Sequence, residues 1–498
     1  MLEGLTTGLS TAFSLQNILF LVTGCFAGTF IGMLPGLGPM TAIALMIPIA
    51  SALEPSAGII MMAAVYYGAI FGGSTSSILI NAPGVASTVA TSFDGYPLAR
   101  SGKAGKALAV AAIASFSGGI IAAILLLLFA PYLATVSLSF QSTDYFALII
   151  LGLVSVAAFA GSSGMLKALT MSVFGLMLST IGSDQTQGLP RFTLGRIDLI
   201  DGISFLLLVM ATFALSEALL SIIRPADAPS EKETFKDIGM TKREIRETAP
   251  AVTRSSFLGF LVGLLPGAGA TIGSFLAYAS EQRLAPKALR EKFGQGSLRG
   301  LAAPESANNA AATGSFVPLL TLGIPGSGTT AILLGALIAY GIQPGPLLYI
   351  NNPEVFWGVI VSMWLGNVVL LILNLPLIPY IARLLTLPRG ILLPLVLFFS
   401  LIGVYLVSFN TFDLQLMVLF AVIAVFFRLM DFPMAPMILG FILGGMIEEN
   451  LRRALLIYDG SWSFLWERPL TAVIMVLVLI VLLAPLVWQL KANRRTPS

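Results

Sequence analysis

Two short segments, one in each half of the chain, place a proline among glycines inside a hydrophobic run. Residues 28–38 read Gly-Thr-Phe-Ile-Gly-Met-Leu-Pro-Gly-Leu-Gly, and residues 259–269 read Gly-Phe-Leu-Val-Gly-Leu-Leu-Pro-Gly-Ala-Gly. Proline removes a backbone donor, and glycine tolerates conformations that break a helix. In a membrane the freed backbone groups need partners from protein, water or ligand. Broken hydrophobic segments at corresponding positions of two halves are typical of transporter binding sites.

The amino-acid composition indicates a membrane protein. The chain has 498 residues, of which 57% are hydrophobic and only 10% are charged, and its mean hydropathy is +0.93. A soluble domain has about 25% charged residues. Runs of about 20 apolar residues, long enough to span a bilayer, recur along the whole sequence. We therefore expect a polytopic protein surrounded by lipid, with no nucleic-acid partner.

The residue inventory narrows the possible chemistry. Histidine is absent, and the single cysteine, Cys25, lies in an apolar segment. Catalysis by histidine, haem ligation, disulfides and thiolate metal sites are therefore excluded. No phosphate-binding loop or nucleophile elbow occurs either. We expect neither an enzyme nor a cofactor, and sodium or a proton as the coupling ion.

Three anchors recur in the same order in both halves and predict an internal duplication. They are Pro35-Gly36 with Pro266-Gly267, Pro83-Gly84 with Pro325-Gly326, and Pro131-Tyr132 with Pro379-Tyr380, at offsets of 231, 242 and 248. Basic residues occupy 100–106 and 283–299, but not the matching loops, so equivalent loops should lie on opposite sides of the membrane. The predicted fold is an all-α polytopic membrane protein with two inverted-topology repeats and broken or re-entrant helices.

The predicted boundaries follow from this pattern. Residues 1–223 form the first transmembrane repeat, 224–254 a polar cytoplasmic linker and 255–469 the second repeat. A C-terminal helix and a basic cytoplasmic tail occupy 470–498. The two proline-glycine turns should approach each other near the middle of the membrane.

Backbone carbonyls in the two turns are candidate ligands for a coupling ion. The residues concerned are Gly32, Pro35, Gly36, Gly38, Gly263, Pro266, Gly267 and Gly269. Sodium accepts carbonyl, hydroxyl and amide oxygens, so a sodium site at the proline-glycine turns is the favoured interpretation. Kinks or close helix packing are the structural alternative.

Neutral polar residues beside the breaks are candidates for binding a carboxylate, together with the free N–H groups of half-helix N-termini. They are Ser74, Thr75, Ser76, Ser77, Asn81, Pro83, Gly84, Asn308, Asn309, Pro325, Gly326, Ser327, Thr329 and Thr330. Serine and threonine also serve as packing residues between membrane helices, and that alternative stays open.

Glu305 is the rival coupling residue. As a helix, Glu305, Asn308 and Asn309 would share one face at i, i+3 and i+4. A carboxylate in a membrane segment is a functional candidate and can carry a proton. Helix capping after Pro304 is the alternative. Glu217, inside another apolar run, also lacks an obvious structural role.

Several motifs closely resemble the large membrane subunit of the tripartite tricarboxylate transporter family. They are Tyr67-Gly-Ala-Ile-Phe-Gly-Gly-Ser-Thr-Ser-Ser77, Asp201-Gly-Ile203, Gly-Leu-Leu-Pro-Gly-Ala-Gly-Ala-Thr-Ile at 263–272, Ala-Ala-Pro-Glu-Ser-Ala-Asn-Asn-Ala-Ala at 302–311, Leu-Thr-Leu-Gly-Ile-Pro-Gly at 320–326 and Glu448-Glu-Asn-Leu-Arg-Arg453. The resemblance covers about residues 15–470. It implies a secondary transporter of carboxylates in the bacterial inner membrane, coupled to sodium or protons. It also implies two partners, a small four-helix membrane subunit and a periplasmic substrate-binding protein.

The residues and the resemblance together predict symport of a carboxylate, a tricarboxylate or related organic acid. The binding protein should dock on outer loops that include 183–201 and 341–353. An ion or organic-anion channel is the alternative, which needs a continuous polar path through the membrane. A membrane-embedded enzyme ranks third.

Overall fold

The computed structural model describes residues 2–34, 37–158, 164–184, 188–223, 238–267, 269–381 and 389–493. Within these residues, seven helical segments are long and apolar enough to cross a membrane: Leu15–Met33, Pro55–Ile80, Ala86–Ser137, Phe205–Ile223, Pro353–Asn374, Thr411–Leu429 and Met434–Ile457. Two strands of two residues each, β1 (Gly182–Ser183) and β2 (Pro190–Arg191), pair antiparallel in a loop. The predicted all-α polytopic membrane fold is confirmed.

The first half of the chain consists of helices with a few short 3-10 and π segments. In order these are α1 (Leu2–Ala12), α2 (Leu15–Met33), α3 (Gly38–Ala50), α4 (Pro55–Ile80), η1 (Ala86–Thr88), α5 (Val89–Leu98), η2 (Ala99–Lys103), α6 (Ala104–Ser137), α7 (Ser142–Ala158), α8 (Met165–Ser179), η4 (Ile197–Leu199), α9 (Phe205–Val209), η5 (Met210–Leu215) and α10 (Ser216–Ile223).

The second half is helical throughout its described parts. Its helices are α11 (Lys242–Gly263), α12 (Gly269–Leu284), α13 (Lys287–Arg290), α14 (Leu298–Gly314), α15 (Phe316–Leu322), α16 (Gly328–Ala339), α17 (Leu348–Asn351), α18 (Pro353–Asn374), α19 (Ile378–Ile381), α20 (Arg389–Ser408), α21 (Thr411–Leu429), α22 (Met434–Ile457), α23 (Phe464–Glu467) and α24 (Pro469–Asn493).

The helix that opens the second half starts earlier than expected. α11 begins at Lys242, inside the range predicted as linker. Thr241 and Glu244 form a capping box: the Thr241 hydroxyl accepts from the Glu244 N–H at 3.3 Å, and the Glu244 carboxylate accepts from the Thr241 N–H at 2.7 Å. Such a box fixes a helix start because it satisfies two otherwise free donors. The polar residues after it form the first turns of a helix.

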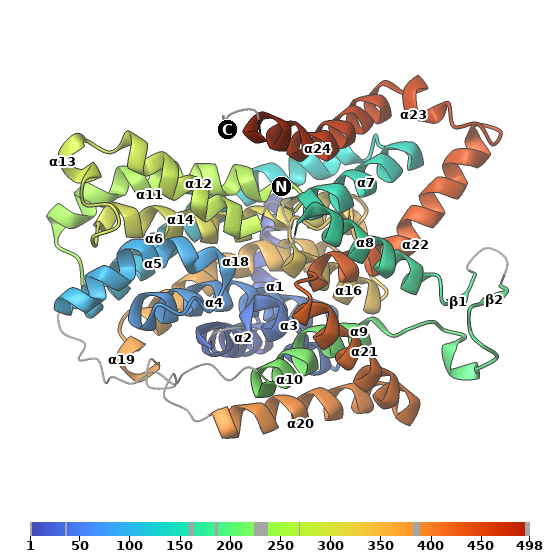
Figure 1. Ribbon diagram of the computed structural model, residues 1–498, viewed down its shortest axis with the longest axis horizontal. Helices are drawn as coiled ribbons and strands as arrows, with labels where there is room; N and C mark the ends of the chain where they lie inside the picture. The colour runs from blue at the N-terminus through green and yellow to red at the C-terminus, as the bar shows by residue number, and fades with distance from the viewer. Residues whose placement is uncertain are drawn as a thin grey trace.

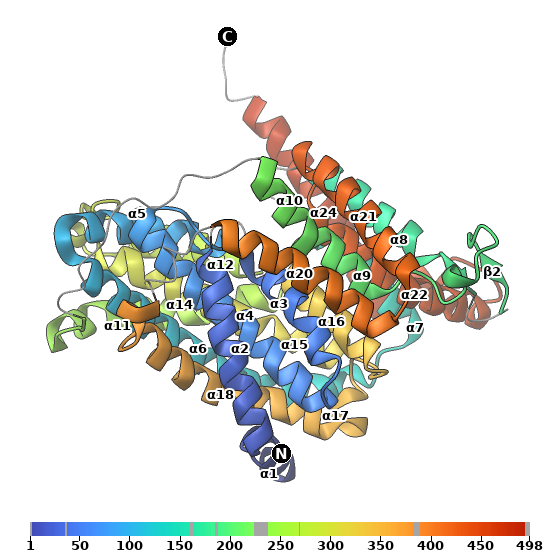
Figure 2. The ribbon, with the colours of Figure 1, turned by 90° about the horizontal axis from the view of Figure 1, so that it is seen from below.

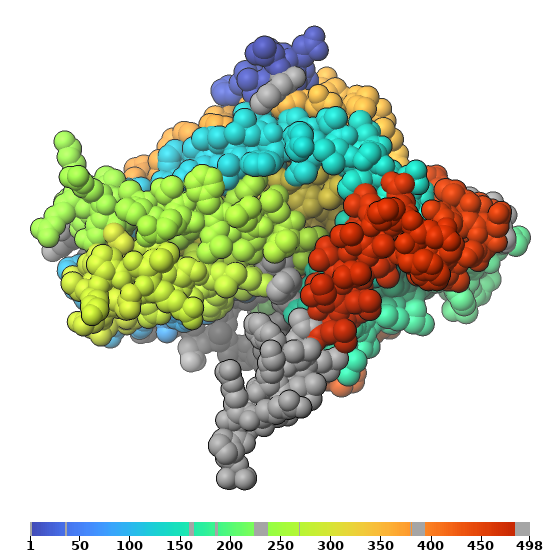
Figure 3. All heavy atoms as spheres, turned by 90° about the horizontal axis from the view of Figure 1, so that it is seen from above, coloured from blue at the N-terminus to red at the C-terminus, as the bar shows by residue number. Residues whose placement is uncertain are grey.

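Two helical groups lie side by side in the molecule. One is formed by α2, α3 and α4, the other by α11, α12 and α14 (Figure 1). α5 and α6 pack against both α4 and α14 and so join the two groups. Elsewhere α22 packs along α7 and α8, and α1 and α24 lie at opposite ends of the view in Figure 2. Seen from above, α6 runs across the molecule next to α11 (Figure 3).

The same backbone contacts occur in both groups. In each, two glycines of the first helix lie so close to carbonyl oxygens of its partner that a Cβ atom would not fit. The contacts are Gly28 on Val65 and Gly32 on Ala69 in the first group, and Gly259 on Ala307 and Gly263 on Ala311 in the second. The offsets are 231 for the glycines and 242 for the carbonyls, the values of the sequence anchors. The two groups thus share one packing pattern, while their inverted orientation in the membrane remains a prediction.

The C-terminal ends of α4 and α15 also match between the two halves of the chain. Asn81 ends α4 in the left-handed region with φ 51°, and Gly323 ends α15 there with φ 69°, again 242 residues apart. The next residue donates backward in both cases, from Ala82 N to Ser76 O at 3.5 Å and from Ile324 N to Pro318 O at 3.2 Å. A left-handed cap turns the chain sharply out of the helix. Each turn leads directly into a proline-glycine pair.

Candidate functional site

The Glu305 carboxylate is fully buried near the middle of α14. It accepts hydrogen bonds of 2.7 Å from the hydroxyls of Ser74 and Ser115, and a third from the hydroxyl of Thr91. Ser74 lies on α4 of the first group, and the other two donors lie on α6 and α5, which join the groups. A charged group away from water is tolerated only where donors of this kind surround it.

The capping alternative for Glu305 is wrong. α14 begins at Leu298, and the hydroxyl of Ser297 caps it by accepting from the Gly300 N–H at 3.2 Å. Pro304 lies inside the helix, where its missing N–H removes one bond of the ladder. Glu305 therefore extends from the helix interior into a polar pocket of neighbouring helices.

Asn308 and Asn309 follow Glu305 one turn later, as their spacing predicts. The Asn309 amide donates to the Glu305 carbonyl at 3.0 Å and to the Asn308 side-chain oxygen at 2.8 Å. The Asn308 amide nitrogen is buried and has no hydrogen-bond partner among the described residues. A buried donor without a partner costs about 1–3 kcal/mol. This position therefore favours a ligand or a water that accepts from it.

A small cavity adjoins the Glu305 group. Its volume is about 10 Å³, and its wall includes Ser74, Thr75, Ser115 and Asn374. The Asn374 amide donates to the Leu370 carbonyl at 3.0 Å, whereas its oxygen is buried without a partner in the described residues. A space of this size is about that of one water molecule. Hydroxyl and amide oxygens thus line a space that suits one small oxygen-bound species, and two of these hydroxyls donate to the Glu305 carboxylate.

The first break is described on both sides of its turn. α2 ends at Met33 and α3 begins at Gly38, which has φ 64°. Gly84, of the second proline-glycine pair in this half, lies against the Gly32 carbonyl, so a side chain at position 84 would not fit. Pro35 and Gly36, predicted to contribute to a coupling-ion site, lie outside the described residues.

The second break has the same arrangement. Pro266 and Gly267 form the turn after α11, and Gly267 has a φ of 82°. The Gly267 N–H donates a hydrogen bond to the Gly326 carbonyl at 3.0 Å. Gly326 packs against the Gly263 carbonyl as Gly84 packs against that of Gly32. In each half, the second proline-glycine pair therefore packs against the end of the helix that leads into the first pair.

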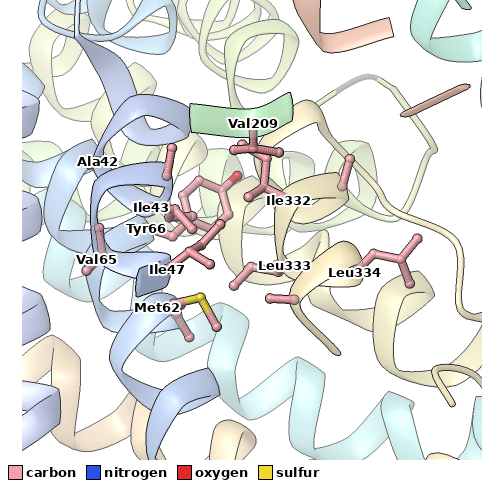
Figure 4. Close-up of a cluster of buried hydrophobic side chains, with 14 of the residues drawn as sticks. Ala42, Ile43, Ile47, Met62, Val65, Tyr66, Val209, Ile332, Leu333 and Leu334 are labelled. Atoms are coloured by element: carbon pink, nitrogen blue, oxygen red, sulfur yellow. The ribbon is translucent and has the colours of Figure 1, made fainter. Parts of the chain in front are cut away.

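The broken segments of the two halves meet at one junction, between α3 and α16. A Cβ atom added to Gly328 would lie 3.1 Å from the Met40 sulfur. The hydroxyl oxygens of Tyr66 and Ser327 are 3.5 Å apart. Buried side chains of α3, α4 and α16 gather around Tyr66, including Ile43, Ile47, Ile332 and Leu333 (Figure 4). The half-helix N-termini of α3 and α16 therefore approach each other at the boundary between the halves.

Ser327 and Thr330 form a capping box at the start of α16. The Ser327 hydroxyl accepts from the Thr330 N–H at 3.2 Å, and the Thr330 hydroxyl accepts from the Ser327 N–H at 2.8 Å. Thr329 is buried beside them. A Cβ atom added to Gly269 would lie 3.4 Å from the Cβ of Ser327, so the second break also adjoins this N-terminus. Pro325 and Gly326 lead directly into this N-terminus.

The hydroxyl run of the first half does not form one cluster. Ser74 bonds Glu305, whereas Ser76 and Ser77 donate to the Gly73 carbonyl at 3.2 and 2.8 Å. Ser77 also donates to Thr88 at 2.7 Å, away from Glu305. The run lies on α4, where successive residues point about 100° apart. Asn81, Pro83 and Gly84 form the turn that follows it.

Four functional candidates escape the sequence reasoning: Thr91, Ser115, Asn374 and Tyr66. None of them belongs to a motif whose spacing distinguishes it from a packing residue. The Glu217 carboxylate, in contrast, has a structural partner, because Arg428 of α21 forms an ion pair with it. In this partly buried pair each charge has an opposite charge as its partner, which lowers the cost of placing both in a membrane segment.

Comparison with known proteins agrees with this architecture. The model of the tripartite tricarboxylate transporter TctA family matches residues 18–439. An uncharacterized 52.8 kDa protein of the TAR-I ttuC' 3' region of Agrobacterium vitis is 41% identical over 495 residues, which are 99% of this chain and 98% of the relative. A protein of the TAR-II ttuC' 3' region of the same organism is 41% identical over 236 residues, 47% of this chain and 97% of the relative. No solved structure matches. The chain belongs to the tripartite tricarboxylate transporter TctA family.

Proposed function

We propose that this protein is the membrane subunit through which a bacterium imports a tricarboxylate or related organic acid in symport with sodium. It works in the inner membrane with a small four-helix membrane subunit and with a periplasmic protein that delivers the acid. The family name supports a tripartite transport system, and the seven candidate spans among the described residues support a path across the bilayer.

The observation that carries the proposal is the junction of the two halves at α3 and α16. The N-terminal N–H groups of a helix and nearby hydroxyls suit a carboxylate, because the helix dipole is positive there. Ser327, Thr329 and Thr330 supply such groups at α16, and the Tyr66 hydroxyl faces Ser327 from the other half. A carboxylate held here contacts both halves, and movement of one half against the other exposes it to alternate sides.

Sodium suits the oxygens around Glu305. The hydroxyls of Ser74 and Ser115 and the Asn374 side chain line a cavity of about 10 Å³, and both hydroxyls also donate to the Glu305 carboxylate. These oxygen donors match the preference of a hard cation, and a sodium ion there offsets the buried negative charge. Carbonyls of the turns at 35–38 and 266–269 are a second sodium site in this proposal.

Uptake by proteoliposomes that contain the membrane subunits tests this function. A panel of mono-, di- and tricarboxylates is offered with and without the binding protein, under an inward sodium gradient. We expect saturable uptake of one class of acid, dependent on both sodium and binding protein. Non-saturable flux that ignores both would favour the channel alternative and contradict the proposal.

A further inference from the structure

A second, much larger cavity lies away from the Glu305 group. Its volume is about 1040 Å³, and residues of α7, α8, α9, α16, α22 and the loop at 341–347 line it. Cavities of several hundred cubic ångströms are the usual size for small organic ligands. The site described above makes no use of this space.

Two sequence motifs without a role in the proposed function converge on this cavity. All three residues of the motif at 201–203 line the cavity. The motif at 448–453 contributes Glu449, Asn450 and Arg453 to the same wall. The motifs are far apart in the chain, and the fold brings them together here. Their convergence indicates a built site and not a packing defect.

α22 carries two glutamate–arginine pairs with different surroundings. Glu448 and Arg452 are 2.6 Å apart, and both are held by other charges: Arg452 contacts Asp184 at 2.6 Å, and Glu448 contacts Arg191 at 2.8 Å. This network ties α22 to the loop that contains β1 and β2. Its members are braced from several sides and serve structure.

The second pair, Glu449 with Arg453, faces the cavity. The side chain of Glu449 is 45% exposed and that of Arg453 is 62% exposed. An exposed ion pair contributes about 0–1 kcal/mol, so little is lost when another anion replaces one partner. Arg453 is the only cationic side chain in the described wall of the cavity, which also contains Asp201.

The cavity shares a wall with the second broken segment. Leu322, the last residue of α15, lines it. The next residue is Gly323, and a Cβ there would lie 3.0 Å from the Pro344 carbonyl of the covering loop. Ile324 and Pro325 then lead to the N-terminus of α16. The cavity therefore adjoins the segment that leads to the junction.

We propose that this cavity is an entry station in which Arg453 exchanges Glu449 for a carboxylate group of the incoming acid. The inference rests on the proposed function, since it assigns the same substrate class to a second site on its route. Glu449 is released into the water of the cavity, and Arg453 offers a bidentate fork to the substrate carboxylate. The negative charges of Glu449 and Asp201 keep binding weak, which suits a site that must release its ligand onward.

Thiol labelling tests the station without relying on transport. Ser204 lines the cavity, is exposed and caps α9 without a side-chain hydrogen bond. In membranes that contain the transporter, Ser204→Cys should react with a membrane-impermeant maleimide. The unaltered chain serves as the blank because its one thiol, Cys25, is fully buried. Acetate, succinate and citrate are then tested as protectants.

We expect at least one of these acids to slow labelling of Ser204→Cys in a saturable way. Adding Arg453→Gln should raise the half-protecting concentration about tenfold or more, as for loss of a hydrogen bond to a charged group. Arg453→Lys should restore part of the protection, and Glu449→Gln should lower the half-protecting concentration because it removes the competitor. Arg196→Gln is the matched control, since Arg196 is 54% exposed and pairs with Asp198 outside the cavity wall.

The proposal is overturned if none of the three acids slows labelling of the Ser204→Cys variant, or if protection is unchanged by Arg453→Gln. Normal sodium-driven uptake together with either result would leave the proposed function intact. Arg453-dependent protection without any uptake would instead support the site and contradict the transport proposal.

Discussion

The group of α2, α3 and α4 and the group of α11, α12 and α14, taken with α15 that follows it, have the same backbone contacts. The side chains at matching positions differ. Ala63, Tyr66 and Tyr67 in the first group correspond, at offset 242, to Glu305, Asn308 and Asn309 in the second. The glycine contacts and the left-handed caps are kept on both sides. The comparison indicates that the duplicated backbone is the scaffold, and that divergence of its side chains placed the charged and amide groups in one half only.

The contacts between the groups show the same division. Ser74 of the first group donates to Glu305, whereas its counterpart in the second group, Phe316, packs against the rings of Tyr66 and Tyr67 at centroid distances of 6.0 and 6.3 Å. Matching positions thus reach across to the opposite group in both cases. One contact is polar and involves a carboxyl group, and the other is aromatic. This asymmetry separates the proposed ion site from the apolar packing of the junction.

The largest effects should come from the shared scaffold, and they should be equal in the two groups. Gly32→Ala and Gly263→Ala each force a Cβ into a partner carbonyl. Overpacking of this kind costs about 1–3 kcal/mol or more, so both variants should lose thermal stability in detergent by similar amounts. Gly445→Ala in α22 is the control, because a Cβ there meets no described atom within 4 Å. A large loss in one group only would break the correspondence.

The next largest effect should be confined to the second group. Glu305→Gln keeps the side-chain shape but removes the charge, so it should raise the half-saturating sodium concentration for uptake about tenfold to a hundredfold, as for loss of a charged partner. Ser306→Ala is the matched control, since its hydroxyl donates to the Ala303 carbonyl of its own helix, at 3.1 Å. Equal sodium dependence in both variants would remove Glu305 from the ion site.

The hydroxyls around Glu305 should have smaller effects. Ser115→Ala removes one donor of three and should raise the half-saturating sodium concentration about threefold to tenfold, since a typical hydrogen bond contributes about 0.5–1.5 kcal/mol. Ser77→Ala is the comparison within the first group, because its hydroxyl bonds Gly73 and Thr88. Sodium titrations of uptake measure both. A larger shift for Ser77→Ala would place the ion elsewhere.

The smallest effects should appear at the junction. The Tyr66 to Ser327 contact is long, at 3.5 Å, so Tyr66→Phe should change the KM for the acid by less than about threefold, as for a weak neutral hydrogen bond. Ser327→Ala also loses a helix cap worth about 1 kcal/mol and should raise KM more, with kcat less affected. Kinetics at saturating sodium distinguish the two variants. The reverse order would mean that Tyr66 binds the acid directly.

The scaffold could be predicted from the sequence because its signals are local. Proline-glycine breaks recur in the same order in both halves, and the glycines at 28 and 32, like those at 259 and 263, lie about one helical turn apart. The spacing of Glu305, Asn308 and Asn309 also predicts one face correctly. The linker prediction misses the start of α11, although Thr241 and Glu244 have the spacing of a capping box, because the charge of this stretch outweighs that signal.

The partners of Glu305 could not be predicted in the same way. Thr91 and Ser115 come from helices far from Glu305 in sequence, and neither hydroxyl belongs to a spacing pattern that points to Glu305. The run at 74–77 looks like one cluster in the sequence, but helical geometry directs Ser74 and Ser77 to different neighbours. Long-range packing decides these contacts, and sequence spacing does not encode it.

The most direct test of sodium coupling is substrate uptake by proteoliposomes at fixed membrane potential, with a sodium gradient or a proton gradient imposed alone. The account predicts uptake driven by the sodium gradient and not by the proton gradient. It also predicts that Glu305→Gln retains this preference but needs more sodium. If a proton gradient alone drives uptake, sodium does not, and Glu305→Gln abolishes the proton dependence, Glu305 carries a proton and the sodium account is contradicted.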